Sequence, residues 1–216
     1  MVSSSPLFSI FYSLFLYSLM NNLFPIFLKL ENLRLLVVGG GAVGIEKTKA
    51  VLDNSPLATV TVVAPEIREE LKALQSSHPN LKLIYASYAL EHLEEKDLVI
   101  AATCIKELNK QVWSDAKLNK ILVNVADTPD LCDFYLSSIV RKGNLKIAVS
   151  TNGKSPTMAK RIREVLEEAL PEEIDEVLDK LHELREKLKG DFDYKVKKMN
   201  DITSSMKLNP DEPKDE

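Results

Sequence analysis

A run of three glycines directly after a short apolar segment is the feature that most constrains this fold. Residues 34–38 (Arg-Leu-Leu-Val-Val) lead into Gly39-Gly40-Gly41, and Ala42-Val43-Gly44 follows. A short apolar run is typical of a buried strand, and consecutive glycines are typical of a tight turn. Apolar residues at helical spacing continue to Asp53, where Asn54-Ser55-Pro56 ends the pattern. The segment is therefore predicted to form a strand, a turn and a helix in close succession.

The glycines also match the pattern G-x-G-x-x-G, in the strand–turn–helix setting that gives this pattern its meaning. In such a motif Gly39 allows the tight turn, Gly41 lets the backbone approach a pyrophosphate, and Gly44 lets helix and strand pack closely. The pyrophosphate lies at the helix N-terminus, here Ala42 and Val43, where unpaired amides favour an anion. We therefore expect a bound dinucleotide. The alternative is a glycine-rich turn without a ligand.

Four further apolar segments predict the rest of a sheet, and they cover residues 59–64, 81–85, 98–102 and 121–125. The third of them is fully apolar, as a central strand of a parallel sheet would be. Leu108, Val112 and Ala116 mark one face of a helix before the last strand. Strands that alternate with helices at these lengths predict an α/β fold with a doubly wound parallel sheet of the Rossmann type.

The pattern changes beyond Asp127. Alternating apolar residues over 145–149 predict a half-buried strand, and the polar loop Ser150-Thr151-Asn152-Gly153-Lys154-Ser155 follows it. Ser155 as N-cap and Pro156 as first residue open a helix. Two apolar stripes predict a helix ended by Pro171 and a second one ended by Gly190; they consist of Met158, Ile162, Val165, Leu166 and Ala169, and of Ile174, Val177, Leu178, Leu181, Leu184 and Leu188. These stripes must pack on the sheet or on a second subunit, so we expect a homodimer.

The end of the second strand bears on the identity of the cofactor. An acidic residue at this place normally binds the adenosine ribose hydroxyls, and here Pro65 and Glu66 follow the strand. Arg68 is an alternative that would suit the 2′-phosphate of NADP, and the prediction is NAD. Thr103, after the fourth strand, lies on the ligand-binding edge of such a sheet, although its hydroxyl would equally serve to satisfy the backbone. The predicted cofactor-binding residues are Gly39, Gly41, Ala42, Val43, Gly44, Pro65, Glu66 and Thr103.

Composition excludes several other classes of protein. The net charge of -4 offers no basic excess for nucleic acid. Cys104 and Cys132 form no CxxC pair, and His78, His92 and His182 are scattered through polar segments. We therefore expect no disulfide scaffold and no metal site, and a reducing cytoplasm is the simplest location.

The N-terminus carries no charge over residues 7–28 and is long enough to span a bilayer. It lacks the basic segment and the small-residue cleavage site of a secretory signal. Either this segment is a membrane anchor, or Met20 is the genuine start and residues 1–19 extend the reading frame upstream. The second interpretation is favoured because of the resemblance described next, and a membrane association is expected only if residues 1–28 are a real anchor.

Several sequence motifs follow one another along the chain. They are Pro25-Ile26-Phe27-Leu28, Gly39 to Val43, Val63-Ala64-Pro65-Glu66, Ala101-Ala102-Thr103, Asn124-Val125-Ala126-Asp127-x-Pro129-x-x-Cys132-x-Phe134, Ala148 to Pro156, and Ala159-Lys160-Arg161-Ile162-Arg163. Together these motifs resemble the precorrin-2 dehydrogenase family, the dehydrogenase and ferrochelatase module of sirohaem synthases. The resemblance covers about Asn22 to Leu170, and members usually begin a few residues before the Pro-Ile-Phe motif, as a start at Met20 would. Ser137 departs from it, because members typically carry proline there.

The resemblance implies NAD-dependent oxidation of precorrin-2 to sirohydrochlorin. Some members of the family also insert ferrous iron into sirohydrochlorin, so this activity is a second expectation, with the iron as a substrate and not a bound cofactor. It points to Asp127, directly after the fifth strand, as the catalytic base, with Asp133 as the fallback and an Asx turn before Pro129 as the structural alternative.

The tetrapyrrole substrate is expected on Ser150, Thr151, Asn152, Gly153, Lys154 and Ser155. Its carboxylates would meet the basic residues nearby, which are Arg141, Lys142, Lys154, Lys160, Arg161 and Arg163, although a solvated charged surface is an alternative for each of them. No methyltransferase segment follows in this sequence, so it resembles the stand-alone form, and the methylation would come from another protein. The rival hypothesis is an NAD-binding regulatory or sensor module without catalysis.

The expected organisation has five parts. An apolar extension (1–19) precedes the NAD-binding Rossmann domain (20–130), and a region for dimerisation and substrate binding (131–155) comes next. A helical domain (156–200) and a disordered, proline- and acid-rich tail (201–216) complete the chain.

Overall fold

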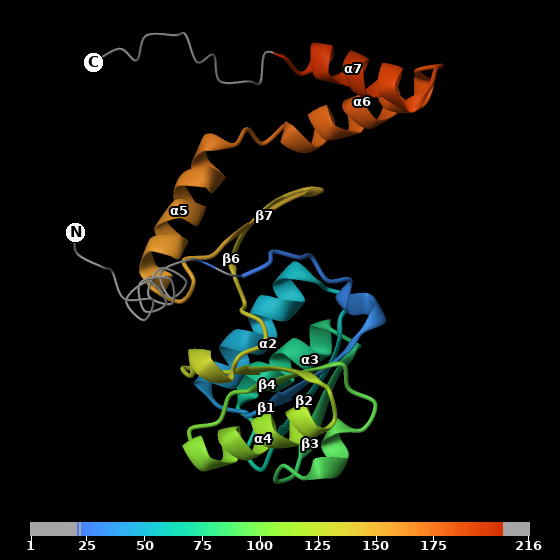
Figure 1. The fold of residues 1–216 in the computed structure, drawn as a ribbon. Coiled ribbons are helices and arrows are strands. Elements are labelled where there is room, and N and C mark those ends of the chain that lie inside the picture. The colour runs from blue at the N-terminus through green and yellow to red at the C-terminus, as the bar shows by residue number, and fades with distance from the viewer. Residues whose placement is uncertain (1–20, 22, 205–216) are drawn as a thin grey trace, which may run out of the picture. The chain divides into compact units, whose positions relative to one another are not determined.

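The computed structural model describes residue 21 and residues 23–204, and its main element is a parallel five-stranded sheet (Figure 1). Its strands are β1 (Arg34–Val38), β2 (Thr59–Ala64), β3 (Leu81–Tyr85), β4 (Leu98–Ala101) and β5 (Leu122–Val125). The strand order is β3-β2-β1-β4-β5, and every pair is parallel. The chain winds outward from β1 in both directions, which confirms the doubly wound sheet. Each strand begins and ends within one residue of its predicted bounds.

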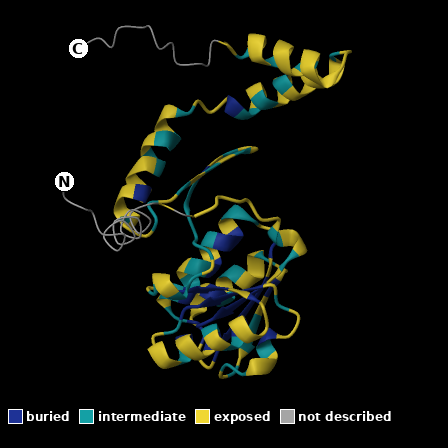
Figure 2. Ribbon diagram, viewed as in Figure 1, coloured by how far each residue is buried: buried dark blue, intermediate teal, exposed yellow. Residues whose placement is uncertain are grey.

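The side chains of β1 alternate between two apolar layers, and this alternation explains why helices cover both faces of the sheet. Leu35 and Val37 belong to a cluster with residues of α2 (Ala42–Asn54) and α3 (Glu69–Ser77). Leu36 and Val38 belong to a second cluster, with residues of α4 (Lys106–Leu118). The strands are the most deeply buried part of the chain (Figure 2). Each fully buried leucine or valine contributes roughly 1.5–3 kcal/mol.

A second compact unit contains residues 138–149 and the helices beyond residue 160. Its strands β6 (Ser138–Lys142) and β7 (Leu145–Val149) form an antiparallel hairpin. The hairpin turn is tied to the start of α6, because Asp175 Oδ1 accepts hydrogen bonds from the backbone nitrogen (2.7 Å) and the side-chain nitrogen (3.0 Å) of Asn144. Its helices are α6 (Ile174–Lys187), α7 (Phe192–Ile202) and the part of α5 (Pro156–Ala169) from Lys160 on, while the first turn of α5 belongs to the first unit.

Three short 3-10 helices connect these elements, namely η1 (Leu30–Asn32), η2 (Leu90–Leu93) and η3 (Pro129–Leu131). The predicted end of the second C-terminal helix at Gly190 is wrong by three residues, because α6 ends at Lys187. Gly190 instead lies before α7 with a φ of 136°, and Asp191 caps α7 by accepting a hydrogen bond from Tyr194 N at 2.9 Å. Since α7 extends from Phe192 to Ile202, it crosses the expected domain boundary at residue 200.

The interpretations of residues 1–19, of Met20 as the start and of the tail from residue 205 on concern segments outside the described residues, whereas residues 201 and 202 of the expected tail belong to α7. Within the part that the structure describes, no helix is both long enough and apolar enough to cross a membrane.

Candidate active site

The predicted cofactor residues and Asp127 follow four strands at the same edge of the sheet. The glycine loop follows β1, Glu66 follows β2, Thr103 follows β4 and Asp127 follows β5. All these strands are parallel, so their carboxyl ends share one edge. The strand order reverses between β1 and β4, where sheets of this type bind their ligands. The structure therefore brings these segments to one crevice-forming edge.

Gly39 and Gly44 are required by the fold itself. Gly39 has a φ of 130°, and a β-carbon there would lie 2.4 Å from the carbonyl oxygen of Ala102. A β-carbon on Gly44 would lie 2.0 Å from the carbonyl oxygen of Gly39, so α2 packs against the turn at a distance that only glycine allows. The predicted tight turn and close helix packing are present.

Gly41 differs from these two glycines because nothing in the folded chain requires it. Its φ is -87°, and an added β-carbon would meet no described atom within 4 Å. Gly41 is the N-cap of α2, and no side chain caps the helix. The first amides of α2, from Ala42 and Val43, have no hydrogen-bond acceptor among the described residues and carry the partial positive charge of a helix N-terminus. This cradle fits the pyrophosphate of a dinucleotide.

The segment after β2 lies directly against the glycine loop. A β-carbon on Gly40 would lie 2.3 Å from the carbonyl oxygen of Glu66, and Arg68 N donates to Gly40 O at 3.3 Å. Pro65 and Glu66 are exposed. The structure therefore holds Glu66 beside the loop, where an acidic residue would reach a ribose.

Thr103 has a structural role that the sequence suggested only as an alternative. Its Oγ1 donates to Asn109 Oδ1 at 2.7 Å and accepts from Ile105 N at 3.2 Å. Asn109 is buried, and its Nδ2 donates to Thr103 O at 3.0 Å. The hydroxyl of Thr103 thus satisfies the amide of Ile105 before α4, and the side chain of Asn109 satisfies the backbone of Thr103 after β4. Asn109, which sequence reasoning missed, is the partner that orders this corner.

Asp127 is exposed and sits in a strained turn. Thr128 N donates to Val125 O at 3.2 Å, which closes a four-residue turn with Asp127 at its third position. The φ of Asp127 is 56°, in the left-handed region that aspartate tolerates better than most residues. Among the described residues its carboxylate has no hydrogen-bond or ion-pair partner. The proposed Asx turn is therefore absent, and the carboxylate is open to another molecule.

Asp133 is occupied by the protein, in contrast to Asp127. Its Oδ1 accepts from Lys117 Nζ at 2.7 Å, and its Oδ2 accepts from Val123 N at 3.1 Å. Its own backbone nitrogen donates to Val123 O at 2.7 Å. The segment after η3 thereby folds back along the free edge of β5. Asp133 closes this edge, so the structure does not favour it as a base.

The polar loop over 150–155 is held by hydrogen bonds within itself. Asn152 and Gly153 have φ of 53° and 74°, and Lys154 N donates to Thr151 O at 3.0 Å, as in a type I′ turn. Thr151 Oγ1 accepts from Ser155 N at 3.1 Å, and Ser150 Oγ accepts from Asn152 N at 3.2 Å. Three of the six predicted substrate residues, Ser150, Thr151 and Ser155, therefore shape the loop.

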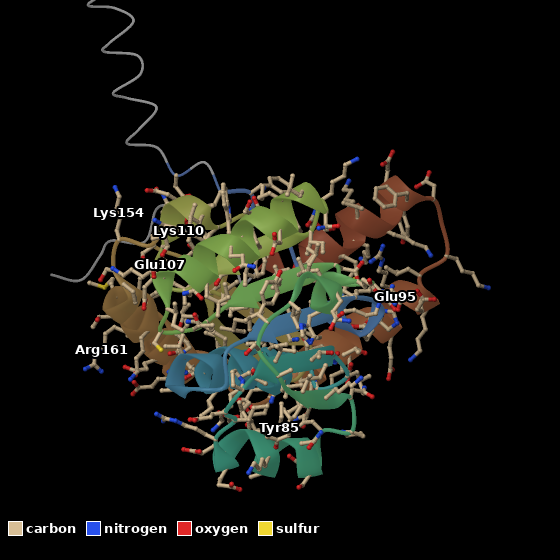
Figure 3. The ribbon with its side chains drawn as sticks, turned by 90° about the horizontal axis from the view of Figure 1, so that it is seen from below. Tyr85, Glu95, Glu107, Lys110, Lys154 and Arg161 are labelled. Carbon is tan, nitrogen blue, oxygen red and sulfur yellow. The ribbon has the colours of Figure 1, made fainter. Side chains whose placement is uncertain are left out.

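The N-terminus of α5 behaves as predicted. Ser155 Oγ accepts from Met158 N at 3.2 Å and caps the helix that Pro156 begins. The side chain of Lys154, just before this cap, extends away from the ribbon (Figure 3).

The other basic residues near this loop are mostly committed to the protein. Arg161 pairs with Glu164 at 2.8 Å, and Arg163 pairs with Glu167. Lys142 is largely buried and donates to Leu170 O and to Glu172 Oε1, both at 2.6 Å. Lys160 lies 3.9 Å from Glu164. Lys160, Arg161 and Arg163 thus belong to ion pairs along α5, as the charged-surface alternative expects, whereas Lys142 fits neither expectation because its side chain is only 10% exposed.

The cysteines and histidines bear no sign of metal chemistry in the described part of the chain. Cys104 and Cys132 are both free thiols, and no group of three or more His, Cys, Asp and Glu is placed to hold a metal ion among residues 23–204. His78 Nδ1 lies 3.0 Å from Leu74 O, and His92 Nδ1 accepts from Ala89 N at 3.0 Å. Burial raises the pKa of the Cys132 thiol above its ordinary value.

Family models match two consecutive parts of the chain. A model described as "Putative NAD(P)-binding" matches residues 26–138, more than half of the chain. A model described as "Sirohaem biosynthesis protein central" matches residues 142–169.

The relatives agree with this assignment. Siroheme synthase of Psychrobacter arcticus is 40% identical over 175 residues, which cover 81% of this chain and 31% of the relative. Siroheme synthase of Pseudoalteromonas translucida is 38% identical over 170 residues, or 79% and 35% of the two chains. This chain thus spans about a third of the length of these relatives.

A solved structure also matches the fold. The structure of SirC, precorrin-2 dehydrogenase, superimposes with a TM-score of 0.68 at 27% identity, over 83% of this chain and 89% of that one. These matches confirm the resemblance that the sequence motifs indicated. The chain belongs to the family that the NAD(P)-binding model describes, and the segment behind that domain is the one described as central in sirohaem biosynthesis proteins.

Proposed function

We propose that this protein oxidises precorrin-2 to sirohydrochlorin with NAD and that Asp127 is its catalytic base. One observation carries the proposal. The exposed carboxylate of Asp127, which has no hydrogen-bond or ion-pair partner among the described residues, follows β5 at the same sheet edge as the open cradle of Gly41. The printed activity of the SirC structure and the names of the siroheme synthases support the same reaction. A sensor module would need the cradle but not Asp127.

The reaction removes two hydrogens from precorrin-2, one as a hydride and one as a proton. Bound NAD supplies the hydride acceptor. The protein must hold the dinucleotide, for which the amides of Ala42 and Val43 and the carboxylate of Glu66 are available. It must also accept the proton, and a carboxylate at the cofactor edge is suited to that step. Both Asp127 oxygens are available for this, since neither has a partner in the described chain.

The substrate carries many carboxylates, and Lys154 is the cation best placed to meet them. Its turn precedes the capped start of α5, whose amides add to the attraction for anions. Asn152 and Gly153 complete the surface of the turn, and a β-carbon on Gly153 would meet no described atom within 4 Å.

The test compares Asp127→Asn with Asp130→Asn, an exposed carboxylate three residues away. Asparagine tolerates the left-handed φ as aspartate does, so the fold should persist. Asp127→Asn should retain NAD affinity and lose turnover by about a hundredfold or more, and Asp130→Asn should behave as wild type. Addition of ferrous or cobaltous ion to the same assay shows whether metal insertion accompanies oxidation. Near-normal turnover of Asp127→Asn would contradict its role as base.

We also propose that the chain is a homodimer in the cytoplasm. Apolar side chains remain exposed on the C-terminal helices, including Met158 (54% exposed), Val165 (63%) and Phe192 (70%). A second copy of the chain that packed on these helices would remove the exposed apolar side chains from water. Two free thiols, one of them used in hydrogen bonds, suit a reducing compartment. A protein that begins at Met20 and sediments as a monomer would contradict the dimer.

A further inference from the structure

Cys132 lies beneath the turn that carries Asp127. Its Sγ is 3.3 Å from Val125 O and 3.4 Å from Thr128 O, so the thiol reaches both ends of that turn. It also accepts from Val125 N at 3.3 Å and from Asn124 Nδ2 at 3.4 Å. The side chain is half-buried and packs against the apolar cluster under β5.

The connection to the turn is fixed from both sides. Cys132 N donates to Pro129 O at 3.0 Å, which closes η3 beneath the turn. Asn124, a buried residue of β5, donates to Phe134 O at 2.7 Å and holds the returning segment on the strand. The thiol is therefore held by residues of β5, while the carboxylate of Asp127 has no hydrogen-bond or ion-pair partner among the described residues. The hydrogen bonds that hold Asp127 in its left-handed conformation are those of the turn backbone, such as Thr128 N to Val125 O.

We propose that Cys132 is a positioning residue for Asp127, acting through hydrogen bonds of its thiol to Val125 and Thr128. This inference rests on the proposed function of Asp127. The protonated thiol donates to one of the two carbonyl groups at a time and accepts from Val125 N. These bonds hold closed the turn that carries Asp127 at the carboxyl end of β5. The thiol neither touches substrate nor acts as a nucleophile.

Two variants separate positioning from packing. Cys132→Val fills the same space and removes every hydrogen bond of the thiol, whereas Cys132→Ser keeps a donor and an acceptor. Val62→Ala, a buried change in β2 away from the turn, is the control for lost stability alone. We expect kcat for precorrin-2 oxidation to fall about ten- to a hundredfold in Cys132→Val and less in Cys132→Ser, since small displacements of a catalytic group have effects of this size. The affinity for NAD should stay unchanged in all three.

Hydrogen exchange gives a second readout that does not depend on activity. The Thr128 amide, which closes the turn, should exchange faster in Cys132→Val than in wild type, and in Cys132→Ser it should stay near wild type. Equal kcat in the valine and serine variants, or a kcat that follows only the loss of stability as in Val62→Ala, would overturn the proposal. Unchanged exchange at Thr128 would overturn it as well. A wild-type protein that does not oxidise precorrin-2 would instead refute the proposed function, and the exchange measurement would still decide whether the thiol holds the turn.

Discussion

Replacement of Gly41 by aspartate should separate cofactor binding from folding, with effects of opposite sign on the two. Gly41 has a φ of -87° and a ψ of -167°, the extended conformation of an N-cap, and a β-carbon there meets no described atom within 4 Å. Aspartate is among the best N-cap residues, and its charge is favourable at a helix N-terminus. Gly41→Asp should therefore leave the free energy of unfolding unchanged or raise it by a few tenths of a kcal/mol.

The same side chain should strongly weaken dinucleotide binding. It would place a negative charge in the space where the pyrophosphate meets the first amides of α2. Two unit charges about 4 Å apart repel by about 4 kcal/mol at the effective dielectric constant of a protein surface. Each 1.4 kcal/mol is a factor of ten in affinity, so the NAD affinity should fall by about a thousandfold.

The assay pairs NAD titration by calorimetry with chemical denaturation of the same sample. Gly44→Ala is the matched control, because its β-carbon would lie 2.0 Å from Gly39 O and must disturb the packing of α2. It should lower the free energy of unfolding, whereas Gly41→Asp should not. If Gly41→Asp binds NAD with wild-type affinity, the cradle is not the pyrophosphate site and the cofactor assignment fails.

Three further predictions follow from the site. Asp133→Asn should lower the free energy of unfolding by about 1 kcal/mol, measured by denaturation, and keep most of the turnover; a loss as large as that of Asp127→Asn would move the base to Asp133. Glu66→Ser should weaken NAD binding about tenfold in calorimetry and leave NADP binding nearly unchanged, whereas equal losses would exclude a contact with the ribose. Lys154→Ala should raise the KM for precorrin-2 about fivefold with kcat unchanged. Lys160→Ala should leave the KM unchanged, because Lys160 already lies near Glu164. Equal effects of the two substitutions on the KM would indicate that only the overall surface charge attracts the substrate.

The strands of the sheet could be predicted well because each of them is marked by residues within its own short segment. Each strand is a short apolar run bounded by a turn or a proline, and burial on both faces leaves little ambiguity in such a run. Helix α3 was missed because it buries only Leu71 deeply and has no sharp apolar stripe. The strand β6 was missed because its pattern of half-buried residues, Ser138 to Lys142, becomes a strand only through pairing with β7. Contacts of this kind join segments, and a single sequence does not display them.

The candidate site was predictable to a similar degree and for the same reason. The glycine loop and Asp127 stand next to strands, so their place at the sheet edge follows from topology. The sequence could not separate residues that face the ligand from residues that build the loops. Thr103 and Ser155 have hydroxyl groups suited to a ligand. In the structure, however, the Thr103 hydroxyl donates to Asn109 Oδ1 and the Ser155 hydroxyl accepts from Met158 N, so both groups stabilise the fold.

Asp127 and Asp133 show how much this separation matters, because the two carboxylates lie six residues apart in one short segment. On sequence alone either one could serve as a base. In the structure, the carboxylate of Asp133 accepts hydrogen bonds from Lys117 Nζ and from Val123 N, and these bonds hold its segment along the edge of β5. Asp127 has a strained backbone and, in the described chain, no partner for its carboxylate. An exposed carboxylate in a left-handed turn, with no hydrogen-bond or ion-pair partner among the described residues, is better explained by the proposed role toward a ligand than by one in the fold.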